Sequence, residues 1–474
     1  MPMASLRPIR SIGDLAGRRV LVLGFARSGI AAARFLVDAG ATVGVYDRRP
    51  AEELIVALDA LEGRAVTPLL GVDAAALSAG LADADLLVAS PSISSSFPTT
   101  EPWLRDLLAE VEARGVELVS EVELFLRLTR ARIAAVTGTK GKTTTASLLA
   151  AMLDRAGIAS VLGGNIGQPL IERADDLGAD DWAVLELSEL QLPTISRGAD
   201  VAVYTNIGAD HLDRHASVEA YRAVKARLAE LTDPRRVIVN RDDPGCLELM
   251  HRSDDGSAYL TYGLDAPNDA FVDDGRIVVA GRPLLPVSDV RLPGLPMLHN
   301  VLAAALGAHL VGAPHDAIAD AIRDFRGVAH RLETVGEWGG IRFVNDSMAT
   351  IPAAAIAALD AFGDHGVVLI AGGQGKGLFL GEMGDAIARR TRGVVLIGEL
   401  ADELTAVIGD RVAVQRAADM DEAVRIAVRM ARTGDVVLLA PAAASFDMYA
   451  DYAARGDAFR AAAAAIGPSL GIPS

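Results

Sequence analysis

The chain has 474 residues, which is too many for one hydrophobic core and predicts two to four domains. Hydrophobic residues make up 51% and charged residues 23%, a globular balance that excludes long disordered stretches. The formal net charge of −17 disfavours nucleic acid as a partner, although loops and helix ends still allow small phosphorylated ligands.

A single cysteine, Cys246, allows no intrachain disulfide and no cysteine-based metal cluster. Residues 1–13 mix arginine with polar residues and contain no apolar signal-peptide core. No apolar run reaches the length needed to span a membrane. We therefore expect a cytoplasmic protein without membrane insertion.

The first part of the chain has the order of a Rossmann-like unit. An apolar run at 18–24 ends in glycine, and a helical stretch follows at 30–39. A second apolar run at 42–46 ends just before Asp47, and another buried strand is expected at 85–89. Strand, glycine turn, helix, strand and acid in this order are typical of a βαβ nucleotide-binding fold.

Two further α/β segments follow, so three consecutive α/β domains are predicted, with boundaries at 1–130, 131–327 and 328–474. In the second, strands are expected at 133–136, 183–187, 201–206 and 237–240, with a helix at 144–156. In the third, strands are expected at 341–346, 366–371, 393–397 and 435–440.

The strongest chemical signal is the loop at residues 138–143, between a predicted strand and a predicted helix. Gly138 and Gly141 let backbone N–H groups approach phosphate oxygens, Lys142 reaches the β- and γ-phosphates, and Thr143 can hold Mg²⁺ through its hydroxyl. The loop is shorter than the general phosphate-loop pattern. The alternative, a glycine–lysine helix entry without a ligand, is disfavoured because strand, loop and helix come in the required order.

The neighbouring signals are weaker. Glu186 ends a predicted strand and His211 follows another, so a carboxylate and an imidazole are available for a metal shell beside the nucleotide. A lone histidine is about as often an ordinary loop residue. Lys225 lies in the predicted helix 220–225, and taken by itself such a residue is more often a solvated lysine.

The third domain offers two candidate anion sites. Arg331 and Asp346 can hold a nucleotide's phosphates and ribose, and a surface ion pair is an equally good interpretation. The glycine-rich segment 372–377 carries Lys376, a suitable counter-charge for a carboxylate. Ser445 follows a predicted strand, and its hydroxyl and helix-start N–H groups suit a second carboxylate. The alternative for Ser445 is a simple helix N-cap.

In this order the motifs resemble the Mur ligases of peptidoglycan synthesis, and within that family the glutamate-adding members. The resemblance extends over nearly the whole chain, and the joint order of motifs is specific although no single motif is. The motifs are residues 137–144, 163–167, 185–188, 210–214, 221–225, 330–333, 345–347, 373–376 and 444–447.

The resemblance implies an ATP-dependent ligase that joins D-glutamate to UDP-N-acetylmuramoyl-L-alanine through an acyl phosphate. It implies a Rossmann-like N-terminal domain that binds the UDP-sugar rather than NAD, a P-loop ATPase-like central domain, and a Rossmann-like C-terminal domain that binds the amino acid. Mg²⁺ would be the cofactor, ATP the co-substrate, and all partners small molecules. The enzyme would be a monomer.

The resemblance also assigns residues. For ATP they are Gly138, Thr139, Lys140, Gly141, Lys142, Thr143, Thr144, Asn300, Arg331 and Asp346. For Mg²⁺ they are Thr143, Glu186, His211 and Lys225, the last as a carbamylated lysine. The catalytic set is Lys142, Lys225, His211 and Lys376. The UDP-substrate would meet Ser28, Asp47, Arg48 and Asn165, and the glutamate would meet Thr350, Lys376, Ser445 and Tyr452.

Two departures from the family pattern keep alternatives open. Lys140 stands where the family usually has asparagine, and Met348 stands where it usually has lysine. A related branch that adds L-glutamate is similar at both positions, so the same reaction with L-glutamate is the first alternative. A folylpolyglutamate-synthase-like enzyme would not need the N-terminal domain. A non-catalytic nucleotide-binding relative is disfavoured by the joint presence of the predicted phosphate and metal residues.

Overall fold

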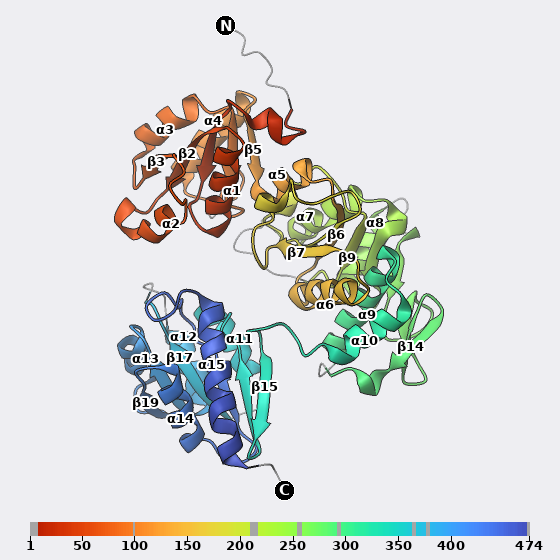
Figure 1. Cartoon of the computed structure of the whole chain (residues 1–474), viewed down its shortest axis with the longest axis vertical. Coiled ribbons are helices and arrows are strands. Elements are labelled where there is room, and N and C mark those ends of the chain that lie inside the picture. The colour runs from red at the N-terminus through yellow and green to blue at the C-terminus, as the bar shows by residue number, and fades with distance from the viewer. Residues whose placement is uncertain are drawn as a thin grey trace. The chain divides into compact units, whose positions relative to one another are not determined.

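The computed structural model describes residues 8–97, 100–208, 217–253, 258–291, 295–362, 366–375 and 380–471. The chain divides into two compact units, Met1–Phe325 and Arg326–Ser474 (Figure 1). The first unit contains two sheets and the second contains one. Within the described ranges, no helix combines the length and the apolar character that a membrane crossing requires.

The first sheet has five parallel strands in the order β3-β2-β1-β4-β5. This order places the strand ends of β1 and β4 at a point where the chain reverses direction across the sheet, which is where open α/β sheets bind ligands. The strands are β1 (Arg19–Leu23), β2 (Thr42–Asp47), β3 (Thr67–Leu70), β4 (Leu86–Ala89) and β5 (Glu117–Ser120). The helices are α1 (Arg27–Asp38), α2 (Ile55–Asp59), α3 (Ala74–Ala82), α4 (Pro102–Ala113) and α5 (Glu121–Leu128).

The second sheet has nine strands in the order β14-β13-β12-β11-β10-β9-β6-β8-β7. Its strands are β6 (Arg132–Thr137), β7 (Ser160–Gly164), β8 (Trp182–Glu186), β9 (Val201–Tyr204), β10 (Val237–Asn240), β11 (Leu260–Tyr262), β12 (Ala270–Asp273), β13 (Arg276–Val279) and β14 (Arg282–Pro286). Its helices are α6 (Lys142–Arg155), α7 (Val218–Glu230), α8 (Pro244–Arg252), α9 (Leu295–Val311) and α10 (His315–Asp324).

β6 is an interior strand of the second sheet's parallel part, between β8 and β9. Its apolar residues are buried on both faces, as a strand covered by helices on each side requires. One face packs with α6 and α9 around a core that includes Leu149, Val203 and Leu306. The other face joins the core of the first sheet.

The second unit contains a six-stranded sheet in the order β15-β16-β20-β17-β18-β19, parallel except at β15. Its strands are β15 (Glu333–Trp338), β16 (Ile341–Asn345), β17 (Val367–Gly372), β18 (Thr391–Ile397), β19 (Ala413–Arg416) and β20 (Val436–Leu439). Its helices are α11 (Pro352–Asp360), α12 (Gly381–Arg390), α13 (Ala401–Ile408), α14 (Met420–Met430) and α15 (Tyr452–Ile466).

The predicted fold class, consecutive α/β domains, is confirmed. The predicted strands are present within a few residues of the expected positions. The structure adds strands that the sequence analysis did not predict. They are β3, β5, β7, β11 and β19, and the strands of the antiparallel pairs, β12, β13, β14 and β15. Helix α6 begins at Lys142 rather than at residue 144, because Gly141 caps the helix in the left-handed conformation and the next residue is already helical.

Candidate active site

The loop between β6 and α6 is held open by glycine and by Asn206. Gly138 and Gly141 have φ angles of +144° and +84°, which other residues adopt only with strain. The backbone N–H of Thr139 donates to the Asn206 carbonyl, and that of Lys140 donates to the Asn206 side-chain oxygen, both at 2.9 Å. The sequence analysis assigned no role to Asn206. It anchors the middle of the loop, so the phosphate-facing donors are the N–H groups at the start of α6.

Lys142 extends across this loop from the first position of α6. Its Nζ donates to the carbonyl oxygens of Gly138 and Thr139, each at 3.0 Å. Thr144 lies two residues further along the same helix and is half-buried. The ammonium group therefore lies among backbone dipoles beside the positive end of a helix, the position expected for a phosphate-binding lysine.

Glu186, at the end of β8, is bound at both carboxylate oxygens. The Thr143 hydroxyl donates to Oε2 and the Asn165 amide donates to Oε1, each at 2.7 Å. The glutamate side chain is buried, so these bonds fix its orientation. A hydroxyl and a carboxylate are the hard oxygen donors that Mg²⁺ prefers, so the residues present fit this ion. Asn165, predicted to meet the UDP-substrate, also orients this carboxylate.

Lys225, in α7, is completely buried, so the interpretation as a solvated lysine is wrong. Its Nζ donates to the Gly138 carbonyl at 2.9 Å and to the Thr137 hydroxyl at 3.3 Å. It also lies over the Tyr221 ring, 5.5 Å from the centroid. The Tyr221 hydroxyl is 3.0 Å from the Thr139 hydroxyl. Helix α7 thus brings a second cation to the underside of the phosphate loop.

Asn300 approaches the same loop from α9. A Cβ atom at Gly141 would lie 2.4 Å from Asn300 Oδ1, so the two residues are in direct contact. Two predicted residues, His211 and Lys376, lie outside the described residues. In the part of the chain that the structure describes, no group of three His, Cys, Asp or Glu side chains is arranged to hold a metal ion.

A cavity of about 440 Å³ lies at the carboxyl edge of the first sheet and is lined by Asp47, Arg48 and Arg49. Asp47 accepts hydrogen bonds from the Phe25 N–H and the Arg49 guanidinium at 2.9 Å and from the Arg49 backbone N–H at 3.0 Å. Burial raises the pKa of the Asp47 carboxyl, but the bonds from Arg49 and Phe25 outweigh burial and hold this pKa below its usual value.

The predicted cation Arg48 is mostly exposed and lies 3.8 Å from Glu101. Arg49, which the sequence analysis did not select, is the arginine that contacts the predicted acid. Ser28, in the first turn of α1, is half-buried and is not among the residues that line this cavity. The structure therefore brings Asp47 and Arg48 to one cavity and adds Arg49 to them.

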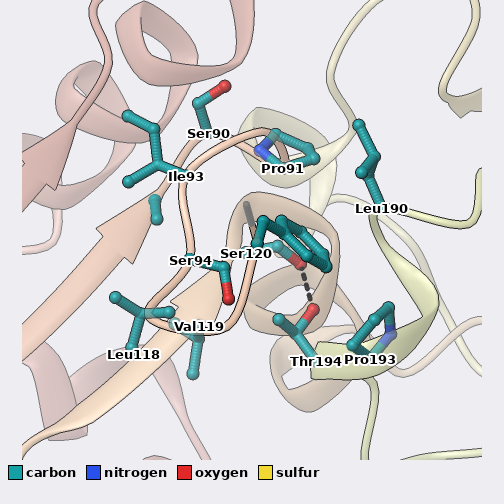
Figure 2. Close-up of a pocket in the computed structure, with 12 residues that line it drawn as sticks. Ser90, Pro91, Ile93, Ser94, Leu118, Val119, Ser120, Leu190, Pro193 and Thr194 are labelled. Atoms are coloured by element: carbon teal, nitrogen blue, oxygen red, sulfur yellow. Dashed lines mark hydrogen bonds between the residues drawn. The ribbon is translucent and has the colours of Figure 1, made fainter. Parts of the chain in front are cut away.

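Ser90 and Ile93 line this cavity and also a second, narrower one, shown in Figure 2. The second cavity is closed on its other side by Leu190 and Pro193, which follow the end of β8. The Ser120 and Thr194 hydroxyls lie 2.8 Å apart beside it. Within the first unit, the loop after β4 and the segment that follows Glu186 therefore line one cavity, and the end of β5 contacts that segment.

In the second unit, Asp346 is buried immediately after β16. The Leu332 N–H donates to its Oδ1 at 3.0 Å. Burial raises the pKa of the Asp346 carboxyl to about 6, against the lowering effects of that hydrogen bond and of the Arg331 charge. Arg331 is exposed, and its charge acts on the Asp346 carboxyl. The two predicted nucleotide residues therefore lie near each other at this end of β16.

Replacing Asp346 with asparagine is expected to stabilise this unit by about 2 kcal/mol at pH 8. Asparagine still accepts the Leu332 bond but carries no buried charge. The pKa of Asp346 is higher in the folded state than its unfolded value of 3.8. The favourable contribution of the aspartate to folding stability is therefore complete below about pH 4, and it is lost as the pH rises through about 6. Urea midpoints of both proteins from pH 4 to 8 measure this. A difference that stays constant with pH would contradict the assignment.

The remaining predicted residues gather at the same sheet edge. Thr350 is half-buried, and its N–H donates to the Met348 carbonyl at 2.8 Å. Ser445 is buried after β20, and its carbonyl accepts the N–H groups of Met448 and Tyr449. Tyr452 is the first residue of α15. The expectation of helix-start N–H groups or an N-cap at Ser445 is wrong, because Asp451 caps α15 and a turn follows Ser445.

Three family models match the chain in order. They are the Mur ligase MurD-like N-terminal domain at residues 18–120, the Mur ligase middle domain at 136–308, and the Mur ligase glutamate ligase domain at 330–443. The described phosphate loop and the Thr143–Glu186 pair fall within the middle domain.

Curated relatives match over nearly their whole length. A UDP-N-acetylmuramoylalanine–D-glutamate ligase from Acidobacterium capsulatum is 40% identical over 458 residues, covering 94% of this chain and 96% of the relative. The ligase of the same name from Gloeobacter violaceus is also 40% identical, covering 94% and 99%. The solved structure of the UDP-N-acetylmuramate–alanine ligase MurC from Thermotoga maritima has a TM-score of 0.54 at 17% identity over 93% of this chain and 98% of that chain, which shows a shared fold. The chain belongs to the Mur ligase family.

Proposed function

We propose that this protein is an ATP-dependent ligase that joins D-glutamate to UDP-N-acetylmuramoyl-L-alanine in peptidoglycan precursor synthesis. The observation that carries the ATP-dependent part is the contact of Thr143 with Glu186 beside Lys142, at the carboxyl ends of adjacent strands. The choice of substrates is supported by full-length relatives that are named for this reaction.

Each of the three sheets is proposed to bind one substrate at the carboxyl ends of its strands. Residues 1–130 bind the UDP-sugar, residues 131–327 bind ATP, and residues 328–474 bind the amino acid. The cavity with Asp47, Arg48 and Arg49 takes the uridine diphosphate. Ser90 and Ile93, which line this cavity, also face Leu190 and Pro193 beyond the end of β8, so the acyl end of the substrate is expected to extend from the cavity towards that end of β8.

The reaction proceeds in two steps. A carboxylate oxygen of the substrate attacks the γ-phosphorus of ATP, the bond to the β-phosphate oxygen breaks, and ADP leaves. The glutamate amine then attacks the acyl carbon, loses a proton, and expels phosphate from the tetrahedral intermediate. Lys142 and the N–H groups of α6 stabilise the phosphate charge in the first step. Bound Mg²⁺, held by Thr143 and Glu186, would supply further positive charge there.

Residues of the C-terminal unit position the second reactant. Ser445, Thr350 and Lys376 hold the glutamate carboxylates so that its amine faces the acyl carbon, which is a positioning effect. His211 would complete the metal site together with Lys225, if the Lys225 ammonium, which donates to the Gly138 carbonyl here, is converted to an anionic carbamate. Asn300, Arg331 and Asp346 contact the nucleotide. The enzyme works as a cytoplasmic monomer.

The test is phosphate release from ATP with UDP-N-acetylmuramoyl-L-alanine and each glutamate enantiomer. We expect release with D-glutamate and at most a few per cent of that rate with L-glutamate. Release with the L form alone would establish the alternative reaction that Lys140 and Met348 suggested. If neither enantiomer gives phosphate release, the protein would be a non-catalytic nucleotide-binding relative of the ligases. The names of the relatives favour the D-glutamate reaction.

A further inference from the structure

Arg455, in the first turn of α15, is the largest of the fully buried side chains that the structure describes. Its guanidinium contacts one segment that is 108 positions away and one that is 11 to 12 positions away. Nε donates to the Ser347 hydroxyl and Nη2 to the Ser347 carbonyl, both at 3.0 Å. Nη1 donates to the carbonyls of Ala443 and Ala444, at 3.0 and 3.2 Å. One side chain thus joins the loop after β16 to the loop after β20.

The acceptors of this guanidinium are carbonyl and hydroxyl oxygens, and the ion pairs among the described residues do not include Arg455. Burial lowers the pKa of Arg455 to about 10, and nearby Asp447 only partly opposes this, so the group still carries its charge at neutral pH. Burying a charge without a carboxylate partner is unfavourable in folding. Four hydrogen bonds to loop oxygens offset this cost, so the guanidinium is held here as a donor group that joins several loops.

A third loop is attached to the same point. The Gln374 N–H, two residues after β17, donates to the Ala444 carbonyl at 2.9 Å. Gly373 packs so closely that a Cβ there would lie 2.2 Å from that oxygen and 3.1 Å from Arg455 Nη1. The carboxyl ends of β16, β20 and β17, three neighbours in the sheet, are therefore all tied to Arg455 directly or through Ala444.

The loop after β20 needs such support because it is strained. Ala442 is buried and has a φ of +62°, a conformation that costs a non-glycine residue about 1 kcal/mol or more. The Ala442 N–H donates to the carbonyl of Ala349 at 2.8 Å, and Ala349 directly precedes Thr350. Ser445 follows directly on the carbonyls that Arg455 holds. The two loops that bear Thr350 and Ser445 are thus fixed relative to each other at this point.

We propose that Arg455 is a positioning residue for the incoming amino acid, setting the spacing between the Thr350 and Ser445 loops to which the glutamate carboxylates bind. This inference rests on the proposed ligase function. It assigns Arg455 no contact with ATP or with the UDP-substrate. Loss of the guanidinium therefore changes the affinity for glutamate and leaves the affinity for the other two substrates unchanged.

The test variant is R455K, because lysine keeps the charge but cannot reach Ser347 and Ala443 together. The KM for D-glutamate is expected to rise about ten-fold, the factor for one lost hydrogen bond to a charged group, with KM for ATP and for the UDP-substrate within about two-fold. A second variant, S347A, removes the acceptor of Nε and is expected to raise the glutamate KM several-fold. If R455K does not fold, the S347A variant tests the proposal in its place.

The matched control is R392K. Arg392 binds Asp435 with two hydrogen bonds at the amino ends of β18 and β20, the opposite edge of the same sheet. It is expected to change none of the three KM values. An unchanged glutamate KM in R455K and S347A would overturn the proposal, as would an equal rise in all three KM values. A wild-type protein inactive with both enantiomers would instead overturn the proposed function.

Discussion

Replacing Lys142 with methionine is expected to reduce ATP-dependent phosphate release about a thousand-fold. Methionine keeps the length and most of the volume of lysine but removes the charge that lies 3.0 Å from the carbonyls of Gly138 and Thr139. Without this ammonium group the loop keeps its bonds to Asn206, its glycine conformations and the bond from Lys225 to the Gly138 carbonyl. The melting temperature is therefore expected to change by only about 2 °C.

The control for this prediction is R155M, at the other end of the same helix. Arg155 is half-exposed and pairs with Asp320 and Asp324 at 3.6 and 3.3 Å. Surface ion pairs of this kind contribute little, so activity within about two-fold of the wild type is expected. If K142M kept a tenth or more of the wild-type rate, Lys142 would not be the phosphate-neutralising group.

The second large effect is expected for G138A, which should lose about 3 kcal/mol of unfolding free energy and nearly all activity. Gly138 has a φ of +144°, and a Cβ atom there would lie 2.0 Å from the Thr205 hydroxyl and 2.9 Å from the Asn206 carbonyl. The hydroxyl can rotate, but the backbone carbonyl cannot move without moving the end of β9. Urea denaturation and the phosphate-release assay measure the two effects.

Gly157 provides the matched glycine control, because it follows the same helix with a φ of +69° and no heavy atom within 4 Å of an added Cβ. G157A should therefore cost only the conformational strain, about 1 kcal/mol, and leave activity near the wild-type value. Equal losses of stability in the two variants would show that strain alone, and not the contact with β9, accounts for the effect at Gly138.

Much of the fold was predictable from local patterns. Buried strands such as β1, β6 and β20 are short apolar runs bounded on at least one side by glycine or polar residues, and that signal lies within a few neighbouring positions. The phosphate loop was predictable for the same reason. The strands β12, β14 and β15 were missed because their mixed, half-exposed patterns resemble loops. β13 is mostly buried, but it is only four residues long.

The site was less predictable where it depends on distant residues. The pattern around Lys225 indicated a solvated lysine, yet α7 packs that side chain under the phosphate loop, 87 positions from the carbonyl it contacts. Arg49 was passed over for Arg48, because only the folded turn shows which arginine reaches Asp47. Arg455 contacts Ser347, 108 positions away, and no local pattern could reveal that contact.

By itself, the sequence determined the central buried strands, several helices and the phosphate loop of this protein, because each depends on residues that are close together along the chain. The order of motifs also determined the resemblance to the Mur ligases. Only the tertiary structure decided which strand ends are neighbours: β6 lies between β8 and β9, and β20 lies between β16 and β17. That order brings Glu186 to Thr143 and Arg455 to three loops, since parallel strands present their carboxyl ends at one edge of a sheet.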